Sequence, residues 1–119
     1  MSLTSNKAGR EGEDLACKLL LEKGFRIIER NFRFGKGEID IIARDGETLV
    51  FVEVKYRQNL EYGEPEYAIT PLKVRQIRRI AECYLYMKKI EETDCRFDAV
   101  AILEEVKGKP SINYYRDAF

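Results

Sequence analysis

One stretch constrains the fold of this 119-residue chain more than any other: residues 37–55, which read GEIDIIARDGETLVFVEVK. Within it, two apolar runs flank the dipeptide Asp45-Gly46. An Asp-Gly pair between two such runs is one of the strongest short-range signals for a β-hairpin. We therefore predict antiparallel strands over about residues 38–44 and 48–55, joined by a two-residue turn at Asp45 and Gly46.

Three ionisable residues lie inside these otherwise apolar strands: Asp40, Glu53 and Lys55. Charges in such places are costly unless they are paired, bind a metal ion or take part in chemistry. The predicted turn pairs Arg44 with Glu47. In that register Asp40 is the diagonal neighbour of Glu53, with Cα atoms roughly 7–8 Å apart. Lys55 lies on the same face, because strand residues two apart point the same way.

The opposite face of the hairpin is predicted to be purely apolar. Its members are Ile39, Ile41, Val50, Val52 and Val54. A three-residue turn would instead move Asp40 to this face, because a shift of one residue exchanges the two faces of a strand. The separation of polar from apolar residues therefore favours the two-residue turn.

The two carboxylates predict a metal site. Carboxylates on one face disfavour each other's ionisation unless a cation lies between them. Oxygen ligands select a hard ion, so we expect Asp40 and Glu53 to bind Mg²⁺ or Mn²⁺. Lys55 can then stabilise a charged phosphate or assist an attacking water. Together with a basic helix, these groups are typical of a site for phosphodiester hydrolysis. The alternative is structural, because Glu and Lys two apart on a strand are most often a surface ion pair.

Composition narrows the chemistry. The chain has no histidine, which excludes Ser-His-Asp and Cys-His catalytic groups, His-ligated zinc and nucleases with a histidine base. The formal net charge is zero, but residues 70–89 contain six Lys or Arg residues against a single Glu. Local patches of this kind, rather than the net charge, set the electrostatic field that a nucleic acid meets.

The sequence contains no sign of export or membrane insertion. Cys17, Cys83 and Cys95 are odd in number and scattered within apolar patterns, so we interpret them as buried free thiols in a reducing compartment. No signal peptide and no apolar run of transmembrane length are present. We therefore expect a cytoplasmic protein with no membrane partner.

The remaining pattern predicts an α/β fold. The further elements expected are a helix over residues 8–23, a strand over 25–34, a helix that starts at Pro71 after the N-cap Thr70, and strands over 95–103 and 111–115. The order α-β-β-β-α-β-β predicts a mixed central β-sheet flanked by helices. We expect residues 1–7 to be disordered, residues 8–119 to form a single domain, and residues 56–68 to form a functional loop.

Several short motifs together resemble the YraN-like family of uncharacterised bacterial proteins. They are Gly12-Glu13, Arg30-Asn31-Phe32-Arg33, Gly37-Glu38-Ile39-Asp40, Phe51-Val52-Glu53-Val54-Lys55 with Arg57, Lys73, and Arg96-Phe97-Asp98. Among these, Asp40 and Glu53-Val54-Lys55 look like the D…E-x-K signature of the PD-(D/E)xK nuclease superfamily. The family is regarded as endonucleases similar to archaeal Holliday-junction resolvases, and the resemblance spans nearly the whole chain.

This resemblance implies an α/β restriction-endonuclease-like core and a metal-dependent endonuclease that hydrolyses phosphodiester bonds in DNA, including branched or junction DNA. It also implies a set of site residues. Asp40 and Glu53 would be metal ligands and the Val54 carbonyl a third ligand. Lys55 would be the catalytic lysine, and Glu13 would be an additional acid from the first helix.

Other residues are candidates for contacts with nucleic acid. Arg57 and Lys73 are candidate phosphate contacts, and Lys73 lies in the first turn of a helix, where free N–H groups favour anions. Arg33 can line a substrate groove or simply keep a strand edge soluble. Arg96 and Asp98 are interpreted as a structural ion pair.

The alternative function is a non-catalytic nucleic-acid-binding or adaptor protein on the same fold. The sequence does not separate RNA from DNA as a partner. A homodimer would suit a two-fold symmetric junction, but no motif in the sequence demonstrates one.

Overall fold

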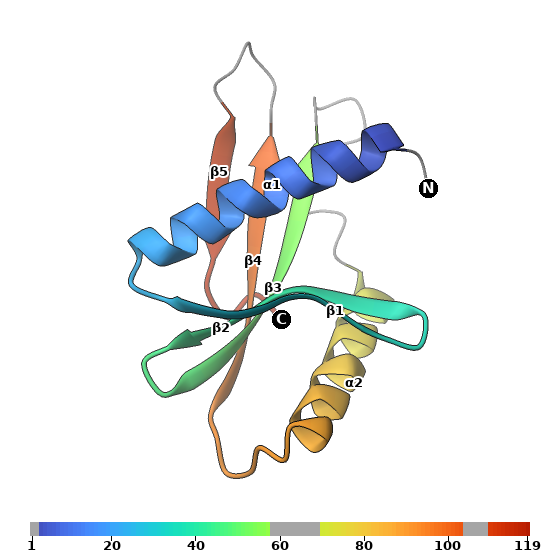
Figure 1. The fold of residues 1–119 in the computed structure, drawn as a ribbon, viewed down its shortest axis with the longest axis vertical. Helices are drawn as coiled ribbons and strands as arrows, with labels where there is room; N and C mark the ends of the chain where they lie inside the picture. Colours follow the sequence, from blue (N-terminus) through green and yellow to red (C-terminus); the bar gives the residue numbers. More distant parts are fainter. Residues whose placement is uncertain (1–2, 58–69, 104–109) are drawn as a thin grey trace.

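The chain forms a mixed β-sheet with a helix on each face (Figure 1). The computed structural model describes residues 3–57, 70–103 and 110–119. Its elements are α1 (Leu3–Glu22), β1 (Arg26–Phe34), β2 (Gly37–Asp45), β3 (Thr48–Arg57), α2 (Pro71–Met87), β4 (Cys95–Leu103) and β5 (Ser111–Tyr115). This order confirms the predicted α-β-β-β-α-β-β arrangement. The expected loop over residues 56–68 lies mostly outside the described residues, although β3 continues through its first two positions.

The strands of the described sheet lie side by side in chain order, β1-β2-β3-β4-β5. The pair β3 and β4 is parallel, whereas the other neighbouring pairs are antiparallel. The parallel pair is connected through α2, which is the crossover that a strand–helix–strand pattern predicts. The sheet is therefore mixed, as expected.

Helix α1 crosses one face of the sheet (Figure 1). Its residues Ala16, Cys17 and Leu20 are buried against β2, β3 and β4. Near the start of this contact, a Cβ on Gly12 would lie 3.2 Å from the Tyr56 ring, so a larger residue would require a shift of a few tenths of an ångström between α1 and this ring. The helix begins at Leu3, before the expected start at residue 8, so part of the segment predicted to be disordered is helical.

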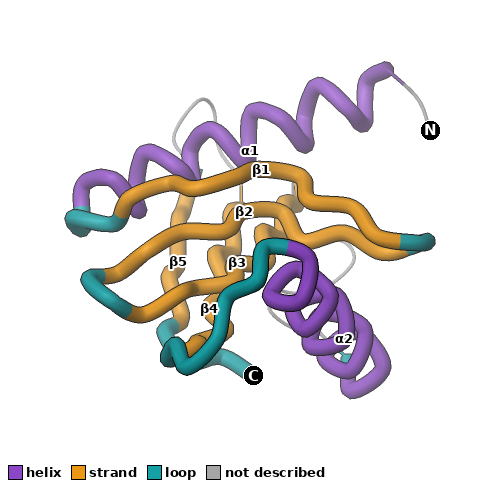
Figure 2. Tube along the Cα trace, turned by 60° about the horizontal axis from the view of Figure 1, so that its bottom comes forward, coloured by secondary structure: helices purple, strands orange, loops and turns teal. Residues whose placement is uncertain are grey.

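Helix α2 covers the other face, where it packs on β1 and β2 (Figure 2). Its buried stripe consists of Ile77, Ile80, Ala81 and Tyr84. The predicted N-terminus is confirmed, because the Thr70 hydroxyl accepts a 3.1 Å hydrogen bond from the Lys73 amide and Pro71 is the first helical residue. The sequence also predicts a hydrophobic contact across this cap between Ile69 and Val74, but Ile69 lies outside the described residues.

The tail after β5 returns to the α2 side of the sheet. The amide of Ala118 donates to the carbonyl of Phe97 on β4. The ring of Phe119 lies beside that of Phe97, with centroids 6.2 Å apart. The tail thus lies next to the part of this face that α2 does not cover.

The hairpin turn differs in detail from the prediction. Asp45 pairs with Thr48, so the two-residue loop is Gly46-Glu47 rather than Asp45-Gly46. Gly46 has a φ of 62° and is the first loop residue, the position at which a type II′ turn requires glycine. Arg44 consequently pairs with Leu49, two residues further along than expected. A shift of two preserves which side chains share a face.

One member of the predicted apolar face is on the other side. Ile39 packs in the cluster under α2 together with Ile42, whereas Ile41 packs under α1. Regular alternation therefore breaks between residues 39 and 42. Asn31, which lies opposite Asp40 in the register of β1 and β2, has a φ of 56°. A left-handed residue turns the chain out of regular strand geometry, and asparagine tolerates it better than most residues.

The cysteines are free thiols, as predicted, but they are not all buried. Cys17 is buried on the side of α1 that faces the sheet, Cys83 is half-buried and Cys95 is exposed at the start of β4. The prediction of burial was wrong for Cys83 and Cys95. Both have apolar neighbours in the sequence, but Cys83 lies on the flank of a helix and Cys95 at the end of a strand.

Candidate functional site

The structure brings the carboxyl groups of Asp40 and Glu53 together, and the two side chains are hydrogen-bonded to each other. Asp40 lies just beyond the last regular pair of β2 and β3, which is Ile41 with Val52. The contact thus forms where the regular pairing of the two strands ends. The two carboxylates are the centre of the candidate site.

Asp40 is fixed by the main chain of β3. Its Oδ2 accepts a 2.8 Å hydrogen bond from the amide of Val54. Burial raises the pKa of Asp40 to about 9, helped by the hydrogen bond to Glu53 and by the charges of Glu53 and Glu13, while the Val54 amide acts in the opposite direction. Without a cation, the pair therefore holds a proton at neutral pH.

Glu53 is the most enclosed charge of the site, with only 4% of its side chain exposed. The ammonium groups of Lys55 and Lys73 each lie 3.3 Å from its Oε2. These are ion pairs by distance, but neither has hydrogen-bond geometry, and Oε2 has no hydrogen-bond partner among the described residues. Lys73 comes from the first turn of α2, so this contact also ties the start of α2 to β3.

The donor set fits a small divalent cation. In residues 3–57, 70–103 and 110–119, no three acidic or thiol side chains are close enough together to hold a metal ion. Asp40 and Glu53 form a pair, and Mg²⁺ is often held by one or two carboxylates with water in its other positions. The unsatisfied Oε2 of Glu53 is a buried acceptor that such a cation would satisfy. The Val54 carbonyl as a third ligand stays a prediction.

Glu13 is oriented by β1 rather than by the carboxylate pair. Its Oε1 accepts hydrogen bonds from Asn31 Nδ2 at 3.0 Å and from Arg30 Nη2 at 3.3 Å. The same Arg30 nitrogen pairs with Asp14 at 2.9 Å. The charge of Glu13 nevertheless contributes to the raised pKa of Asp40, so the two acids are electrostatic neighbours. Its catalytic role stays a prediction.

The other two basic candidates lie away from the pair. Arg57 is at the end of β3, and its Nη1 donates to the carbonyl of Tyr56 at 3.4 Å. Arg33 is exposed near the turn between β1 and β2 and pairs with Glu38 at 3.4 Å. Contact of either residue with nucleic acid stays a prediction.

A second buried charge cluster is separate from this site. Asp98 is fully buried and accepts hydrogen bonds from Arg96 Nε and Nη2, each at 3.0 Å to one carboxylate oxygen. Asp98 also accepts from the Tyr114 hydroxyl and from the Asp117 amide. Arg96 reaches Asp45 at the hairpin turn as well. The predicted structural ion pair is thus present, within a larger network that the sequence did not indicate.

These contacts also change the ionisation of the cluster. The hydrogen bond to Asp98 is the main cause that raises the pKa of Arg96. Burial, followed by the hydrogen bond to Asp98, raises the pKa of Tyr114 to about 12. The tyrosine therefore keeps its proton and remains a donor at physiological pH.

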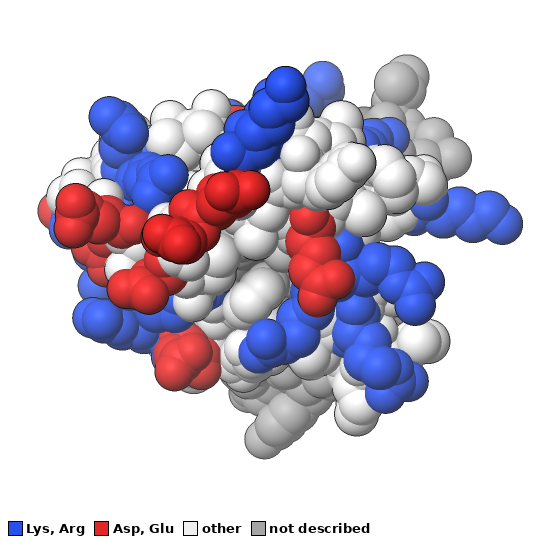
Figure 3. Space-filling view, turned by 90° about the horizontal axis from the view of Figure 1, so that it is seen from below, with Lys and Arg blue, Asp and Glu red and all other residues white. Residues whose placement is uncertain are grey.

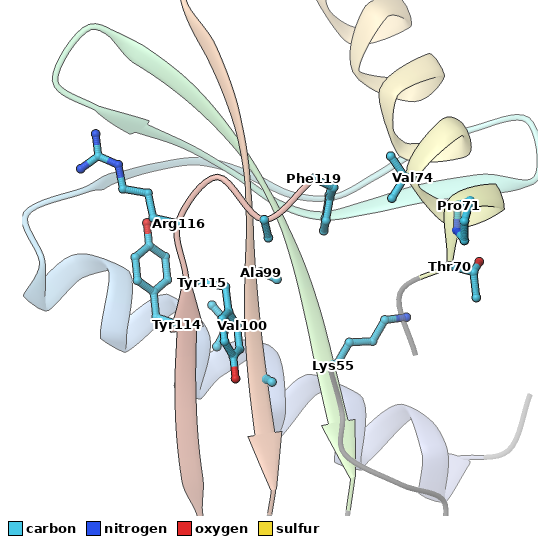
Figure 4. A pocket seen from close by; sticks show the side chains of 12 residues that line it. Lys55, Thr70, Pro71, Val74, Ala99, Val100, Tyr114, Tyr115, Arg116 and Phe119 are labelled. Carbon is cyan, nitrogen blue, oxygen red and sulfur yellow. The ribbon is translucent and has the colours of Figure 1, made fainter. Parts of the chain in front are cut away.

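The sequence also gave no sign of a pocket beside Lys55. It has a volume of about 650 Å³ and lies between the start of α2, β4 and the C-terminal tail (Figure 4). Its lining includes Ala99 and Ala101 of β4 and the ring of Phe119. The lining residues come from four separate parts of the sequence, so only a prediction of the strand order could have found the pocket.

Charge is unevenly distributed around the molecule. In the view from below, basic side chains predominate on the side of α2, whereas the opposite side carries most of the acidic side chains together with further basic ones (Figure 3). Arg75, Arg78 and Arg79 of α2 are exposed, and Lys73 joins them at the start of the helix. The basic surface therefore adjoins the acidic pair through Lys73.

A search of the described helices found none that is both long and apolar enough to cross a membrane.

Sequence comparison identifies the family. The pattern of the uncharacterised protein family UPF0102 matches residues 12–102. A UPF0102 protein of Prosthecochloris aestuarii is 53% identical over 124 aligned residues, which cover 100% of this chain and 98% of the relative. UPF0102 proteins of Geotalea daltonii and Geobacter sulfurreducens are 50% and 48% identical over 111 residues, covering 93% of this chain and 87% of each relative. The chain therefore belongs to the uncharacterised protein family UPF0102, the YraN family that its motifs resemble.

Proposed function

We propose that this protein is a metal-dependent endonuclease that hydrolyses phosphodiester bonds in DNA, including branched or junction DNA. One observation carries the proposal. The carboxyl groups of Asp40 and Glu53 are hydrogen-bonded to each other, and the buried Oε2 of Glu53 has no hydrogen-bond partner among the described residues. A buried carboxylate oxygen that lacks a hydrogen-bond partner and lies beside a second acid is costly for folding alone, and a cation would relieve that cost.

Asp40 and Glu53 would hold the cation, with the Val54 carbonyl as the third protein ligand. When bound, Mg²⁺ or Mn²⁺ would supply positive charge that neutralises the scissile phosphate. It would also lower the pKa of a water molecule, so that the water loses a proton more easily and can attack the phosphate. The hydrogen bond from the Val54 amide fixes one oxygen of Asp40, which leaves the other oxygen to act as a ligand. The side chains of the site are thus oriented before the cation binds.

Lys55 would stabilise the charge that develops on the phosphate. In the structure its ammonium group neutralises Glu53, a task that a divalent cation would take over. Lys55 could then turn toward the phosphate, where an ammonium group stabilises a transition state with added negative charge. Glu13, held by Arg30 and Asn31, would orient the attacking water from the α1 side.

The basic face of α2 would bind the DNA backbone. Arg75, Arg78 and Arg79 are exposed on the same helix that sends Lys73 to Glu53. Contacts of this type are independent of sequence and weaken as the salt concentration rises. Arg57 and Arg33 would extend the phosphate contacts from β3 and from the turn between β1 and β2. A DNA partner also fits the cytoplasmic location expected from the free thiols.

The second candidate function is a non-catalytic nucleic-acid-binding or adaptor protein. A specific observation favours it, because Lys55 and Lys73 already neutralise Glu53 in a buried ion-pair cluster without any cation. In that case the acids and lysines would only join α2 to β3. Binding of nucleic acid without turnover at any divalent cation concentration would support this alternative.

The deciding experiment is a cleavage panel. End-labelled duplex, flap, nicked and four-way DNA are incubated with the protein in Mg²⁺, Mn²⁺ or EDTA. Wild-type protein is compared with Asp40→Asn, with Lys55→Met and with the control variant Glu91→Gln, which changes an exposed acid remote from the site.

We expect cleavage in Mg²⁺ or Mn²⁺ and none in EDTA. Asp40→Asn and Lys55→Met should each lower the rate on the order of 100-fold or more, while circular dichroism remains that of the wild type. Glu91→Gln should cleave like the wild type. Equal cleavage by wild type and Asp40→Asn would refute the proposal, since it would show that the acid pair is not involved.

A further inference from the structure

The pocket beside Lys55 has no role in the function proposed above. Figure 4 shows Lys55 reaching from β3 toward the start of α2, with Phe119 on the opposite side of the opening. The described lining includes Pro71 and Val74 of α2, Ala99 and Ala101 of β4, and the aromatic rings of Tyr115 and Phe119. The pocket thus has largely apolar walls with aromatic rings, and Lys55 and Arg116 are the cationic residues of its described lining.

The pocket lies directly beside the acid pair. In the parallel register of β3 and β4, Glu53 is next to Ala99 and Lys55 is next to Ala101. Neighbouring strands are about 4.8 Å apart, and residues in register point to the same face. A nucleotide base bound over Ala99 would therefore lie close to a phosphate held at Asp40 and Glu53. It could belong to the same nucleotide as that phosphate or to the next one along the strand.

The chemistry of the lining selects a particular ligand. No acidic side chain is among the described residues that line the pocket, whereas Lys55 and Arg116 are positively charged. The aliphatic walls and the rings of Tyr115 and Phe119 suit a flat apolar group. The volume of about 650 Å³ is within the range of small-molecule sites, which is ample for a nucleobase and its sugar. The small side chains of Ala99 and Ala101 keep this space open.

A base in a continuous duplex cannot enter such a pocket, because it is stacked between its neighbours and paired with the other strand. A base must be unpaired or extruded before it can enter a side pocket, and this costs least where it is already single-stranded. Stacking on protein aromatic rings then contributes roughly 1–3 kcal/mol per base and tolerates any sequence.

We propose that this pocket binds an unpaired nucleobase next to the scissile phosphate, so that the protein prefers DNA with unpaired nucleotides at the cleavage point over continuous duplex. The inference rests on the proposed endonuclease function for the position of the phosphate. It adds Tyr115 and Phe119 as residues that determine the choice of substrate and assigns them no part in the chemical step.

The test uses the fluorescent base 2-aminopurine. It is placed as the unpaired nucleotide at the foot of a DNA flap, and a matched duplex carries it in a pair. Binding is measured with Asp40→Asn protein, so that cleavage does not remove the substrate. Phe119→Leu and Tyr115→Leu each replace a ring of the pocket in this background. Tyr86→Leu is the control, because Tyr86 is a highly exposed aromatic on α2 that is not among the lining residues.

We expect the protein to quench the unpaired 2-aminopurine and to leave the paired base unchanged. Phe119→Leu and Tyr115→Leu should each weaken binding of the flap about fivefold or more, which corresponds to the loss of about 1 kcal/mol of stacking, and leave duplex binding unchanged. Tyr86→Leu should alter neither. Two variants are used because Phe119 also packs beside Phe97 and its loss can affect folding, which thermal unfolding would reveal.

The outcomes separate this inference from the proposed function. Quenching that depends on Phe119 or Tyr115 supports the pocket even if no DNA in the panel is cleaved, and in that case only the endonuclease proposal fails. Cleavage of flap and duplex at equal rates, with binding unaffected by both variants in correctly folded protein, overturns the pocket inference and leaves the endonuclease proposal intact.

Discussion

The carboxylate of Asp40 accepts a 2.8 Å hydrogen bond from the main-chain amide of Val54, just beyond the last regular pair of β2 and β3. A side chain thus occupies the place of a strand–strand hydrogen bond at the point where the two strands separate. This contact keeps Asp40 against Glu53 even though both groups prefer to be apart when ionised. The stability of the fold and the chemistry of the site therefore depend on the same carboxylate.

Asp40→Asn should stabilise the protein in the absence of divalent cations. The folded-state pKa of Asp40 is raised from 3.8 to about 9, so its protonation favours folding below pH 4 and this advantage is lost as the pH rises through 9. Asparagine is neutral throughout and can still accept from the Val54 amide. At pH 8 in EDTA we expect a gain on the order of 2 kcal/mol, or roughly 5–10 °C in melting temperature.

Thermal unfolding at pH 5 and at pH 8 measures this effect. The difference between variant and wild type should be clearly larger at pH 8, and Glu91→Gln should show no such change. A variant that is less stable than wild type at pH 8 would show that Asp40 is ionised and favourably paired in the folded protein.

Divalent cations should stabilise the wild-type protein and not the variant. A ligand present at ten times its dissociation constant adds about 1.4 kcal/mol to the free energy of unfolding. We therefore expect Mn²⁺ or Mg²⁺ to raise the melting temperature of the wild type by several degrees and EDTA to reverse the rise. Neither cation should stabilise Asp40→Asn. Equal shifts in both proteins would indicate that the cations bind elsewhere.

Lys55 and Lys73 should be partly redundant partners of Glu53. Each ammonium group lies 3.3 Å from the same buried oxygen, so one lysine can compensate for the loss of the other. We expect Lys55→Met or Lys73→Met alone to cost about 1 kcal/mol and the double variant about 3–5 kcal/mol, because Glu53 then becomes an unpaired buried charge.

Urea unfolding of the single and double variants, repeated in a Glu53→Gln background, measures this coupling. In that background the double lysine replacement should cost little, since no charge remains to be neutralised. Additive losses that are the same in both backgrounds would show that the lysines stabilise the fold independently of Glu53.

The network around Asp98 should be purely structural. Arg96→Met leaves the fully buried Asp98 without its cation and should cost about 3–5 kcal/mol. Tyr114→Phe removes one donor to Asp98 and should cost about 1–3 kcal/mol. Because the folded-state pKa of Tyr114 is raised to about 12, its contribution is complete below pH 10 and is lost as the pH rises through 12.

Two measurements check this assignment. Chemical denaturation between pH 7 and pH 11 should show that Tyr114→Phe loses the same stability at every pH below about 10. Cleavage or DNA binding, measured below the melting temperature of Tyr114→Phe, should match the wild type. A loss of activity in the folded variant would indicate a role in the site beyond structure.

Local sequence signals predicted the elements well where the signal itself is local. The capping hydroxyl of Thr70 and the fixed φ of Pro71 determine where α2 begins, and the structure begins it there. The strands over residues 95–103 and 111–115 follow from apolar runs bounded by turn residues, and both were predicted with their observed bounds. These features need only neighbouring residues.

The hairpin was predicted in kind but not in register. The Asp-Gly pair indicated a two-residue turn. Pairing Arg44 with Glu47, as predicted, or with Leu49, as observed, leaves the same polar and apolar side chains on each face, because the two registers differ by two residues. The choice of Gly46 as the first loop residue decided between them. Ile39 shows the limit of the pattern, because the regular alternation of β2 breaks between residues 39 and 42 and Ile39 packs on the α2 side of the sheet.

The sequence by itself determined that Asp40, Glu53 and Lys55 would share one region of a β-hairpin, because a strand repeats every two residues and any even shift preserves its faces. Only the tertiary structure decided which partners meet there. Lys73 reaches Glu53 from another element, and Arg30 and Asn31 hold Glu13. The pocket beside Lys55 likewise requires β4 and the tail. Such contacts join residues far apart in the chain, and their geometry follows from the order of strands and the placement of helices rather than from any local pattern.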